Sequence, residues 1–316
     1  MEYYYTHCSD EVYFCGGYKS IAMKRLQLII NPTAGMKQGK KYLADIIAYF
    51  GSKGYISTVF VTEKHGDATD FVCRYGAEYE LIVCIGGDGT FNEVVAGLIT
   101  SGLDVPIGYI PAGSTNDFAA SLKLSSDIMK ACRDITEGSE HKLDIGLFNG
   151  RSFSYVASFG AFTKASYATP QSIKNALGHI AYILEGIMDI PQIKPLHLRI
   201  EANDSVYEGE YIFGAVSNST SLGGVLTLDP GIVDMNDGVF EIMLIKSPVN
   251  ITELNIIIKA LGTKQYECSM IDFVKTSNAV IYADKNMDWS LDGEFEPGCE
   301  RIEVENKHSA IRIIIK

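Results

Sequence analysis

The chain has 316 residues, of which 47% are hydrophobic and 21% charged, a composition typical of a globular protein long enough for two domains. Its 27 basic and 39 acidic residues give a net charge of -12, which argues against nucleic acid as a partner and against broad adhesion to anionic membranes, because both need a basic surface. The absence of a membrane-span pattern, a signal-peptide pattern and any CxxC or HExxH motif predicts a cytoplasmic protein without a disulfide framework or structural zinc.

Strand and helix patterns alternate through the first half of the chain. Residues 1–22 show no periodicity and predict a poorly ordered extension. Between residues 23 and 142, the segments RLQLII, YISTVFV, LIVCI and VPIGYI each predict a strand, and the residues from Leu43 to Phe50 have helical spacing. Such alternation predicts an α/β domain with a parallel sheet and right-handed crossovers.

Strand patterns dominate the second half. SFSYVASFGAF, PLHLRIEA, VYEGEYIFGAVSN, GVFEIMLI, FVKTSNAVIYA and WSLDGEF predict an antiparallel β-sandwich over residues 143–299, with the boundary near Lys142 in the polar stretch TEGSEHK. Helical patterns interrupt it at 172–190 and in ITELNIIIKALG; we interpret the first as a core-packing helix, because its few cations form no basic face for a membrane. The last strand, within residues 300–316, is free to return to the first domain. The predicted fold class is α/β plus β.

Four polar turns follow strands of the first domain. They are NPTAG at 31–35, TEKHGDA at 62–68, GGDGTFNE at 86–93 and PAGSTNDFA at 111–119. Loops at the carboxyl ends of parallel strands line one crevice, so all four turns are expected to meet. Glycines at a strand–helix junction let backbone N–H groups approach a phosphate closely, and the helix N-terminus favours its negative charge. The turns therefore predict one shared nucleotide site.

Two common nucleotide motifs do not account for these glycines. The segment GMKQGKKY has three residues between its glycines where a Walker A loop needs four, and it ends without Ser or Thr. Asn92 stands where the dinucleotide fingerprint GxGxxG needs its last glycine. Both interpretations are excluded.

Together with LDGE at 291–294, the turns resemble the diacylglycerol kinase catalytic family, which includes sphingosine, ceramide and bacterial lipid kinases. GGDGT alone is shared with NAD kinases and 6-phosphofructokinases, whereas the full ordered set is highly specific. The resemblance implies an ATP-binding α/β domain, a β-sandwich domain that takes the lipid, and an active site in the cleft between them.

The resemblance also implies roles for individual residues. Nucleotide contacts would come from Asn31, Pro32, Thr33, Gly35, Thr62, Gly86, Gly87, Asp88, Gly89, Thr90, Asn92, Ser114 and Asn116. A water-mediated catalytic Mg²⁺ would involve Asp88, Asp117 and Asp144. Ala120 stands where an arginine commonly follows the NDFA motif, so one phosphate contact would be missing.

A second, structural Mg²⁺ is implied by the segment DPGIVDMNDGVFEIMLI. It would use the side chain of Asp237 and backbone carbonyls of Asp234 and Val239. Asn236 replaces one of the two acids that often precede the glycine, and a hairpin turn at residues 236–238 explains the composition equally well. Both interpretations remain open.

Phosphoryl transfer to an alcohol needs cations beside the phosphates and a base near the attacking hydroxyl. Asp88, beside phosphate-binding glycines, makes sense with Mg²⁺, because two anions repel each other. Asp292 and Glu294 flank Gly293, and alternate strand residues share a face, so both acids are candidates for the base. At this stage the two have almost equal weight.

We therefore expect an ATP-dependent lipid kinase that visits the membrane surface and transfers the γ-phosphoryl group to a lipid hydroxyl, first of all that of diacylglycerol, giving phosphatidic acid. Phosphatidylglycerol, a sphingoid base and a polyprenol are alternative acceptors, because the sequence of the second domain does not identify the lipid headgroup that it selects. An NAD-kinase-like enzyme and a non-catalytic nucleotide-binding regulator are the rival functions. A homodimer is left open.

Overall fold

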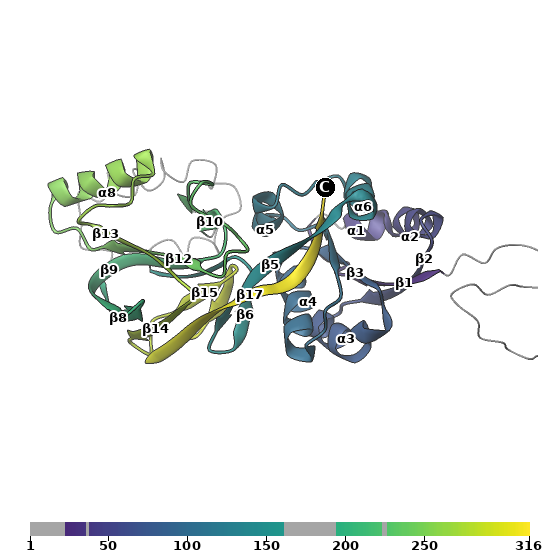
Figure 1. The fold of residues 1–316 in the computed structure, drawn as a ribbon, viewed down its shortest axis with the longest axis horizontal. Coiled ribbons are helices and arrows are strands. Elements are labelled where there is room, and N and C mark those ends of the chain that lie inside the picture. Colours follow the sequence, from purple (N-terminus) through teal and green to yellow (C-terminus); the bar gives the residue numbers. More distant parts are fainter. Residues whose placement is uncertain (1–22, 36–37, 161–193, 223–225) are drawn as a thin grey trace, which may run out of the picture.

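The structure is a computed structural model that describes residues 23–35, 38–160, 194–222 and 226–316. The described chain forms two parts joined by long strands (Figure 1). The predicted extension at 1–22 and the predicted helix at 172–190 lie outside the described residues.

The N-terminal part is the predicted parallel α/β structure. Strands β1 (Lys24–Ile30), β2 (Tyr55–Val61), β3 (Leu81–Gly86) and β4 (Ile107–Pro111) pair in the order β2-β1-β3-β4, and all three pairings are parallel. The connecting helices are α1 (Gln38–Lys41), α2 (Leu43–Ser52), α3 (Asp67–Tyr75), α4 (Asp88–Ser101), α5 (Asp117–Ser121) and α6 (Ile128–Glu137), with a 3-10 turn at Gly76–Glu78.

Strand β3 shows why this sheet is covered on both faces. All six of its residues are buried. Ile82 and Cys84 join the core formed with α3 and α4, whereas Val83 and Ile85 join the core formed with α2 and α6. Because successive strand side chains point to opposite faces, a continuous apolar run is what a central parallel strand requires.

The C-terminal part is the predicted antiparallel β region, with one helix, α8 (Ile251–Thr263), in its described residues. Strands β16, β15, β7, β9, β8 and β14 pair in this order, and β12 pairs with β9 and β13. The strands are β6 (Arg151–Phe153), β7 (Val156–Gly160), β8 (Leu196–Ala202), β9 (Ser205–Ser217), β12 (Phe240–Lys246), β13 (Ile271–Thr276), β14 (Asn278–Ala283), β15 (Trp289–Leu291) and β16 (Glu294–Glu296), and β10 (Ser221–Leu222) and β11 (Leu226–Thr227) form a separate pair.

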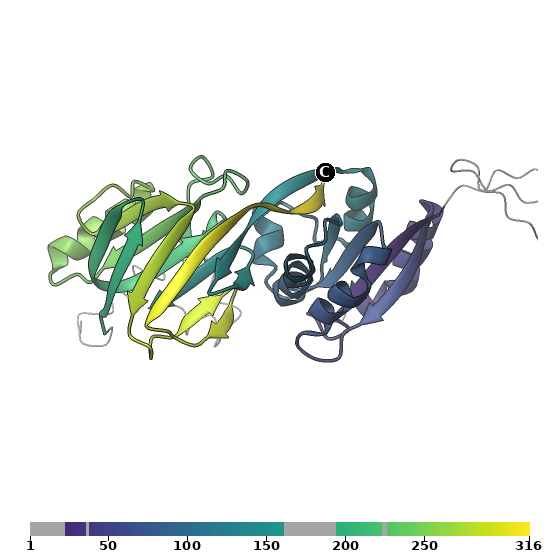
Figure 2. The same cartoon turned by 60° about the horizontal axis from the view of Figure 1, so that its bottom comes forward.

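Two long strands make the parts one continuous sheet. Strand β17 (Arg301–Ile315) pairs with β14 through its first half and with β4 at Ile313, and β5 (Ser139–Phe148) runs antiparallel to it (Figure 2). The predicted boundary at Lys142 therefore falls inside β5 and not in a linker. Residues 139–142 are polar because this end of the strand is exposed, although it remains paired with β17.

No helix within the described ranges combines the length and apolar character needed to cross a membrane. The longest described helix, α4, has 14 residues.

The turns that follow β1, β3 and β4 touch one another through their backbones. A Cβ atom on Gly113 would lie 2.5 Å from the Cα atom of Gly87, and one on Gly35, whose φ is +50°, would collide with the carbonyl oxygen of Ala112. Only glycine permits so close an approach. These contacts draw the three turns to the same edge of the sheet, as their positions in the sequence predict.

Gly113→Ala is expected to separate the turns and to lower the free energy of unfolding by about 1–3 kcal/mol, the usual cost of overpacking. Urea unfolding and nucleotide titration check both stability and ATP affinity, which should fall together. Gly51→Ala is the matched control, because nothing lies within 4 Å of a Cβ at this helical position; it should be neutral or stabilising by about 0.5–1 kcal/mol. Equal stability of the two variants would contradict the packing account.

Candidate active site

Asp88 joins the turn after β3 to the turn after β4. It is the first residue of α4, and its carboxylate accepts hydrogen bonds from the backbone N–H of Asp117 at 2.8 Å and from the Tyr109 hydroxyl at 3.4 Å. Burial raises the pKa of Asp88 to about 6, against the effect of these donors, and the nearby Asp117 charge raises it further. Burial also raises the pKa of Asp117. The structure thus brings these two predicted acids together.

A first cavity of about 300 Å³ opens at the carboxyl ends of β1, β2 and β3. Asn31 makes hydrogen bonds within the lining of this cavity. Its side-chain amide donates to the Thr90 hydroxyl at 3.2 Å, and its side-chain oxygen accepts from the backbone N–H and the hydroxyl of Thr33. The turn after β1 is thereby tied to the start of α4. The cavity is lined by Asn31, Thr33, Thr62, Glu63, Lys64, His65, Gly89, Thr90, Glu93 and Glu294.

Five of the predicted nucleotide residues line this first cavity, namely Asn31, Thr33, Thr62, Gly89 and Thr90. Pro32, Gly35, Gly87, Ser114 and Asn116 lie in the adjoining turns, Gly86 ends β3 and Asp88 begins α4, and none of these seven lines the cavity. Asn116 has a φ of 54°, and its side chain bonds to both the N–H and the carbonyl of Gly113. Its observed role is therefore to shape the turn.

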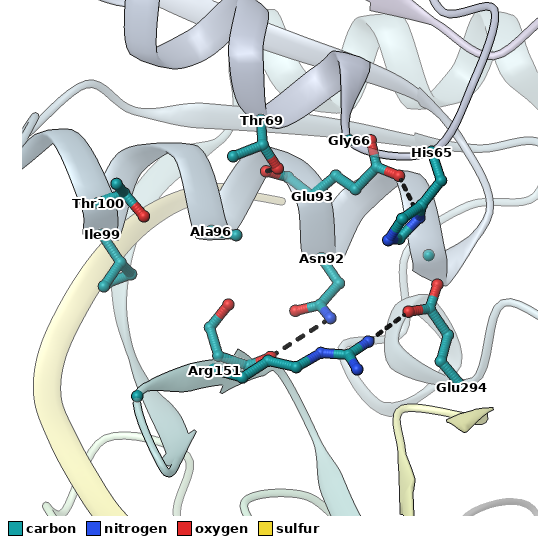
Figure 3. Close-up of a pocket in the computed structure, with 13 residues that line it drawn as sticks. His65, Gly66, Thr69, Asn92, Glu93, Ala96, Ile99, Thr100, Arg151 and Glu294 are labelled. Atoms are coloured by element: carbon teal, nitrogen blue, oxygen red, sulfur yellow. Dashed lines mark hydrogen bonds and ion pairs between the residues drawn. The ribbon is translucent and has the colours of Figure 1, made fainter. Parts of the chain in front are cut away.

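A second cavity, of about 200 Å³, lies between α3, α4 and the hairpin formed by β5 and β6 (Figure 3). His65, Gly89, Glu93 and Glu294 line both cavities, so the two meet at these residues. The Nδ1 atom of His65 contacts the Oε1 atom of Glu93 at 2.9 Å at the junction. The Arg151 side chain extends past Asn92 toward Glu294 in Figure 3.

Asn92 lines the second cavity and not the first, and its nucleotide contact stays a prediction. Only 7% of the residue is exposed. Its amide nitrogen donates to the carbonyl of Ser152 at 3.5 Å, and its amide oxygen accepts from the Ser154 hydroxyl at 3.2 Å. Because both ends of the side chain bond to the β6–β7 segment, Asn92 attaches α4 to the C-terminal part.

Asp292 is enclosed in the protein and bonded to the backbone. It occupies the two-residue turn between β15 and β16, with φ of 51° followed by 86° at Gly293, as an Asp-Gly hairpin turn requires. Its carboxylate accepts the N–H groups of three consecutive residues, Ser154, Tyr155 and Val156. Burial raises the pKa of Asp292 to about 7, although these three donors favour the charged form.

Glu294 is the acid of this motif that faces the cavities. Its side chain is 34% exposed, and one oxygen accepts from the Arg151 guanidinium at 2.7 Å. The other oxygen, Oε1, lies 3.0 Å from the position that a Cβ on Gly89 would take, at the first turn of α4. The expectation that Asp292 and Glu294 share a strand face is wrong, because Asp292 lies in the turn and not in a strand.

The direct contacts of Asp144 are made with the segment before β12 and with β17, and its part in a water-mediated Mg²⁺ network stays a prediction. Its side chain is buried, and it accepts from the backbone N–H groups of Gly238 and Ser309, each at 2.7 Å. His308 contacts it at 2.9 Å. The described contacts of this carboxylate include neither Asp88 nor Asp117, so the structure ties Asp144 to the loop after β11.

The loop itself has turn geometry. Asp234 accepts from the N–H of Asn236 at 3.0 Å, and Asp237 accepts from the N–H of Val239 at 3.1 Å. Across the described residues, no group of three or more His, Cys, Asp or Glu side chains is placed to hold a metal ion. These turns lie in the connection from β11 to β12, two strands that do not pair with each other, so residues 236–238 form a loop turn and not a hairpin. The second Mg²⁺ stays a prediction, because its protein ligands would be one side chain and two backbone carbonyls.

Besides Glu63, four charged or titratable residues that line the cavities were not predicted from the sequence: Lys64, His65, Glu93 and Arg151. The first three lie within two of the four recognised turns, so the signal was present and only Thr62 was taken from its turn. Arg151 had no local signal, because its partner Glu294 is 143 residues away in the sequence.

Comparisons with known proteins agree with this architecture. Residues 25–148 match the diacylglycerol kinase catalytic domain, and residues 156–315 match the YegS C-terminal NAD kinase beta sandwich-like domain. A diacylglycerol kinase of Bacillus subtilis (strain 168) is 35% identical over 276 residues, which cover 86% of this chain and 90% of that protein. A diacylglycerol kinase of Staphylococcus epidermidis is 34% identical over 274 residues, covering 86% of each chain.

Solved structures show the same fold. A crystal structure of a diacylglycerol kinase from Bacillus anthracis str. Sterne has a TM-score of 0.71 at 23% identity, with 93% of this chain and 97% of that chain covered. A second structure from the same organism gives 0.75 at 26% identity with the same coverage. From the sequence matches and this likeness of fold, the chain belongs to the diacylglycerol kinase family and is a kinase of that family, and membership implies the use of ATP.

Proposed function

We propose that the chain transfers the γ-phosphoryl group of ATP to the hydroxyl of diacylglycerol, giving phosphatidic acid, with Mg²⁺ beside the phosphates. The observation that carries the proposal is the position of Glu294. This carboxylate comes from the C-terminal part, yet it lies against the first turn of α4 where the two cavities meet. The diacylglycerol kinases named above, at 34–35% identity, support the choice of acceptor.

The first cavity suits the nucleotide. Thr90 and Gly89 belong to the first turn of α4, whose backbone N–H groups have no partners inside the helix and attract phosphate oxygens. Lys64 lines the same cavity and adds a positive charge that partly offsets the arginine missing at Ala120. The backbone of Lys64 is held by the Asp67 carboxylate, which accepts its N–H at 2.9 Å.

The acids beside this cavity fit a magnesium ion held through water. Asp88 and Asp117 are adjacent and partly buried. Burial raises the pKa of both carboxyls, and the Asp117 charge adds to the rise at Asp88. Two carboxylates, with water completing the shell, match the ligand preference of Mg²⁺. When bound, the ion would neutralise charge on the transferring phosphoryl group. Tyr109 and the backbone of Asp117 orient the Asp88 carboxylate toward that role.

Glu294, and not Asp292, is the proposed base. A base must reach the acceptor hydroxyl with a free lone pair. The Asp292 carboxylate is enclosed and occupied by three backbone donors, whereas Glu294 presents Oε1 at the junction of the cavities. Asp292 therefore acts on the fold, by fixing residues 154–156 and the turn from which Glu294 projects.

Identification of the acceptor tests the proposal directly. We expect the full chain, given radiolabelled ATP, Mg²⁺ and a total lipid extract, to label phosphatidic acid, and added diacylglycerol micelles to increase the product. A parallel reaction with NAD tests the rival kinase class. Label in another lipid would reject diacylglycerol as the acceptor, and label in no lipid at all would reject the lipid kinase activity.

Paired substitutions separate the two acids. Glu294→Gln should lower kcat by about 10²–10⁴-fold, the usual contribution of a general base, without changing the free energy of unfolding. Asp292→Asn should lower the free energy of unfolding by about 1–3 kcal/mol, because an amide cannot accept from three N–H donors. Steady-state kinetics and urea unfolding of the two proteins check this. The assignment is wrong if Asp292→Asn keeps full stability and loses all activity.

Stability should fall as pH rises from 5 to 8. Burial raises the pKa of Asp292 to about 7, so between its ordinary value near 4 and that pH the folded state binds more protons than the unfolded state. This contribution is present at low pH and is lost as pH rises through 7. In urea unfolding, Asp292→Asn should therefore lower the free energy of unfolding by more at pH 5 than at pH 8. A cost that grows with pH would mean that the pKa of Asp292 is lowered.

A further inference from the structure

We propose that Arg151 is a positioning residue, which holds the Glu294 carboxylate in the orientation needed to take the proton of the acceptor hydroxyl. This inference rests on the proposed role of Glu294 as the base. Arg151 begins β6, directly after the tight turn of the β5–β6 hairpin, where Asn149 and Gly150 have φ of 47° and 86°.

The guanidinium of Arg151 spans the strand that carries Glu294. Its Nη2 atom contacts Glu294 at 2.7 Å, while Nη1 contacts the Glu296 carboxylate and the carbonyl of Phe295. The side chains of Arg151, Glu294 and Glu296 are 36%, 34% and 19% exposed, so the three charges are partly shielded from solvent. A planar fork anchored at two points fixes direction as well as distance.

The contact with Arg151 occupies one carboxylate oxygen of Glu294 and leaves the other oxygen available to take a proton. Oε2 accepts from Arg151, whereas Oε1 lies against Gly89 at the start of α4. Figure 3 shows Arg151 reaching Glu294 across the second cavity. A free glutamate side chain samples several rotamers, and ordering it costs entropy in each turnover. The contact with Arg151 holds the Glu294 side chain in one rotamer before the substrate binds, so this entropy cost does not recur in each turnover.

The hairpin that carries Arg151 does not need this contact to stay in place. The backbone N–H of Asn149 donates to the carbonyl of Glu303, and the Asn149 side chain accepts from the N–H of Glu303 at 2.8 Å. Asn92 also holds the carbonyl of Ser152. Strand β6 pairs with β5. Because these bonds fix the hairpin independently, removal of the guanidinium should release Glu294 while leaving the hairpin attached.

A double-mutant cycle tests the inference, with kcat and KM measured for wild type, Arg151→Ala, Glu294→Gln and the double variant. Arg151→Ala should lower kcat by about 10–100-fold with KM for ATP and lipid little changed, the scale of a misplaced catalytic group. In the Glu294→Gln background the same change should have almost no effect, because the residue it positions is absent. Arg151→Lys should restore part of kcat.

Two further variants keep the test independent of folding. Arg199→Ala removes a similarly exposed arginine, paired with Glu201 at 2.6 Å in β8, and should leave kcat unchanged. Glu296→Gln removes the charge of the second carboxylate that Arg151 contacts, while Glu294 and Arg151 themselves stay unchanged. It should lower kcat less than Arg151→Ala. Urea unfolding of every variant identifies any general loss of structure.

The outcomes that overturn the inference differ from those that overturn the base. Equal losses from Arg151→Ala in both backgrounds, or a change confined to KM, would make Arg151 a substrate contact and leave Glu294 as the base. If Glu294→Gln kept the wild-type kcat, Glu294 would not be the base, and the positioning role of Arg151 would be rejected with it.

Discussion

The buried Asp292 carboxylate is the contact on which the geometry of the site depends. Three backbone N–H groups of residues 154–156 converge on it, so one side chain joins the β15–β16 hairpin to the segment between β6 and β7. The same turn determines where the next strand begins and therefore where Glu294 projects. An isolated buried carboxylate is costly, and these charge-favouring donors make it tolerable.

The active-site elements come from distant parts of the chain and meet because the sheet is continuous. Strands β5 and β17 run through both parts, and Asn92 adds a direct attachment between α4 and β6. This rigid frame brings Glu294 against Gly89 at the start of α4. The proposed phosphate site, with backbone groups from one part and an acid from the other, suits phosphoryl transfer, which depends mainly on positioning and charge.

Much of the fold was predictable because its signals are local. The apolar run of β3 and the glycines after it predict a buried parallel strand and a strand–helix turn, and both are present. The polar stretch around Lys142 lies within β5, and exposed residues at the end of a strand have the same polar composition as a linker. Asp292 and Glu294 could not be separated, since the choice depends on donors 136–138 residues away. Arg151 could not be predicted for the same reason, because its partner Glu294 is 143 residues away in the sequence.

The central claim is that Glu294 acts in the chemical step and not in binding. The most direct measurement is the single-turnover rate of phosphoryl transfer from bound ATP in the Glu294→Gln protein, with ATP affinity determined on the same sample. The account predicts unchanged affinity and a transfer rate lower by orders of magnitude. A normal transfer rate, or a loss explained entirely by weaker ATP binding, would contradict it.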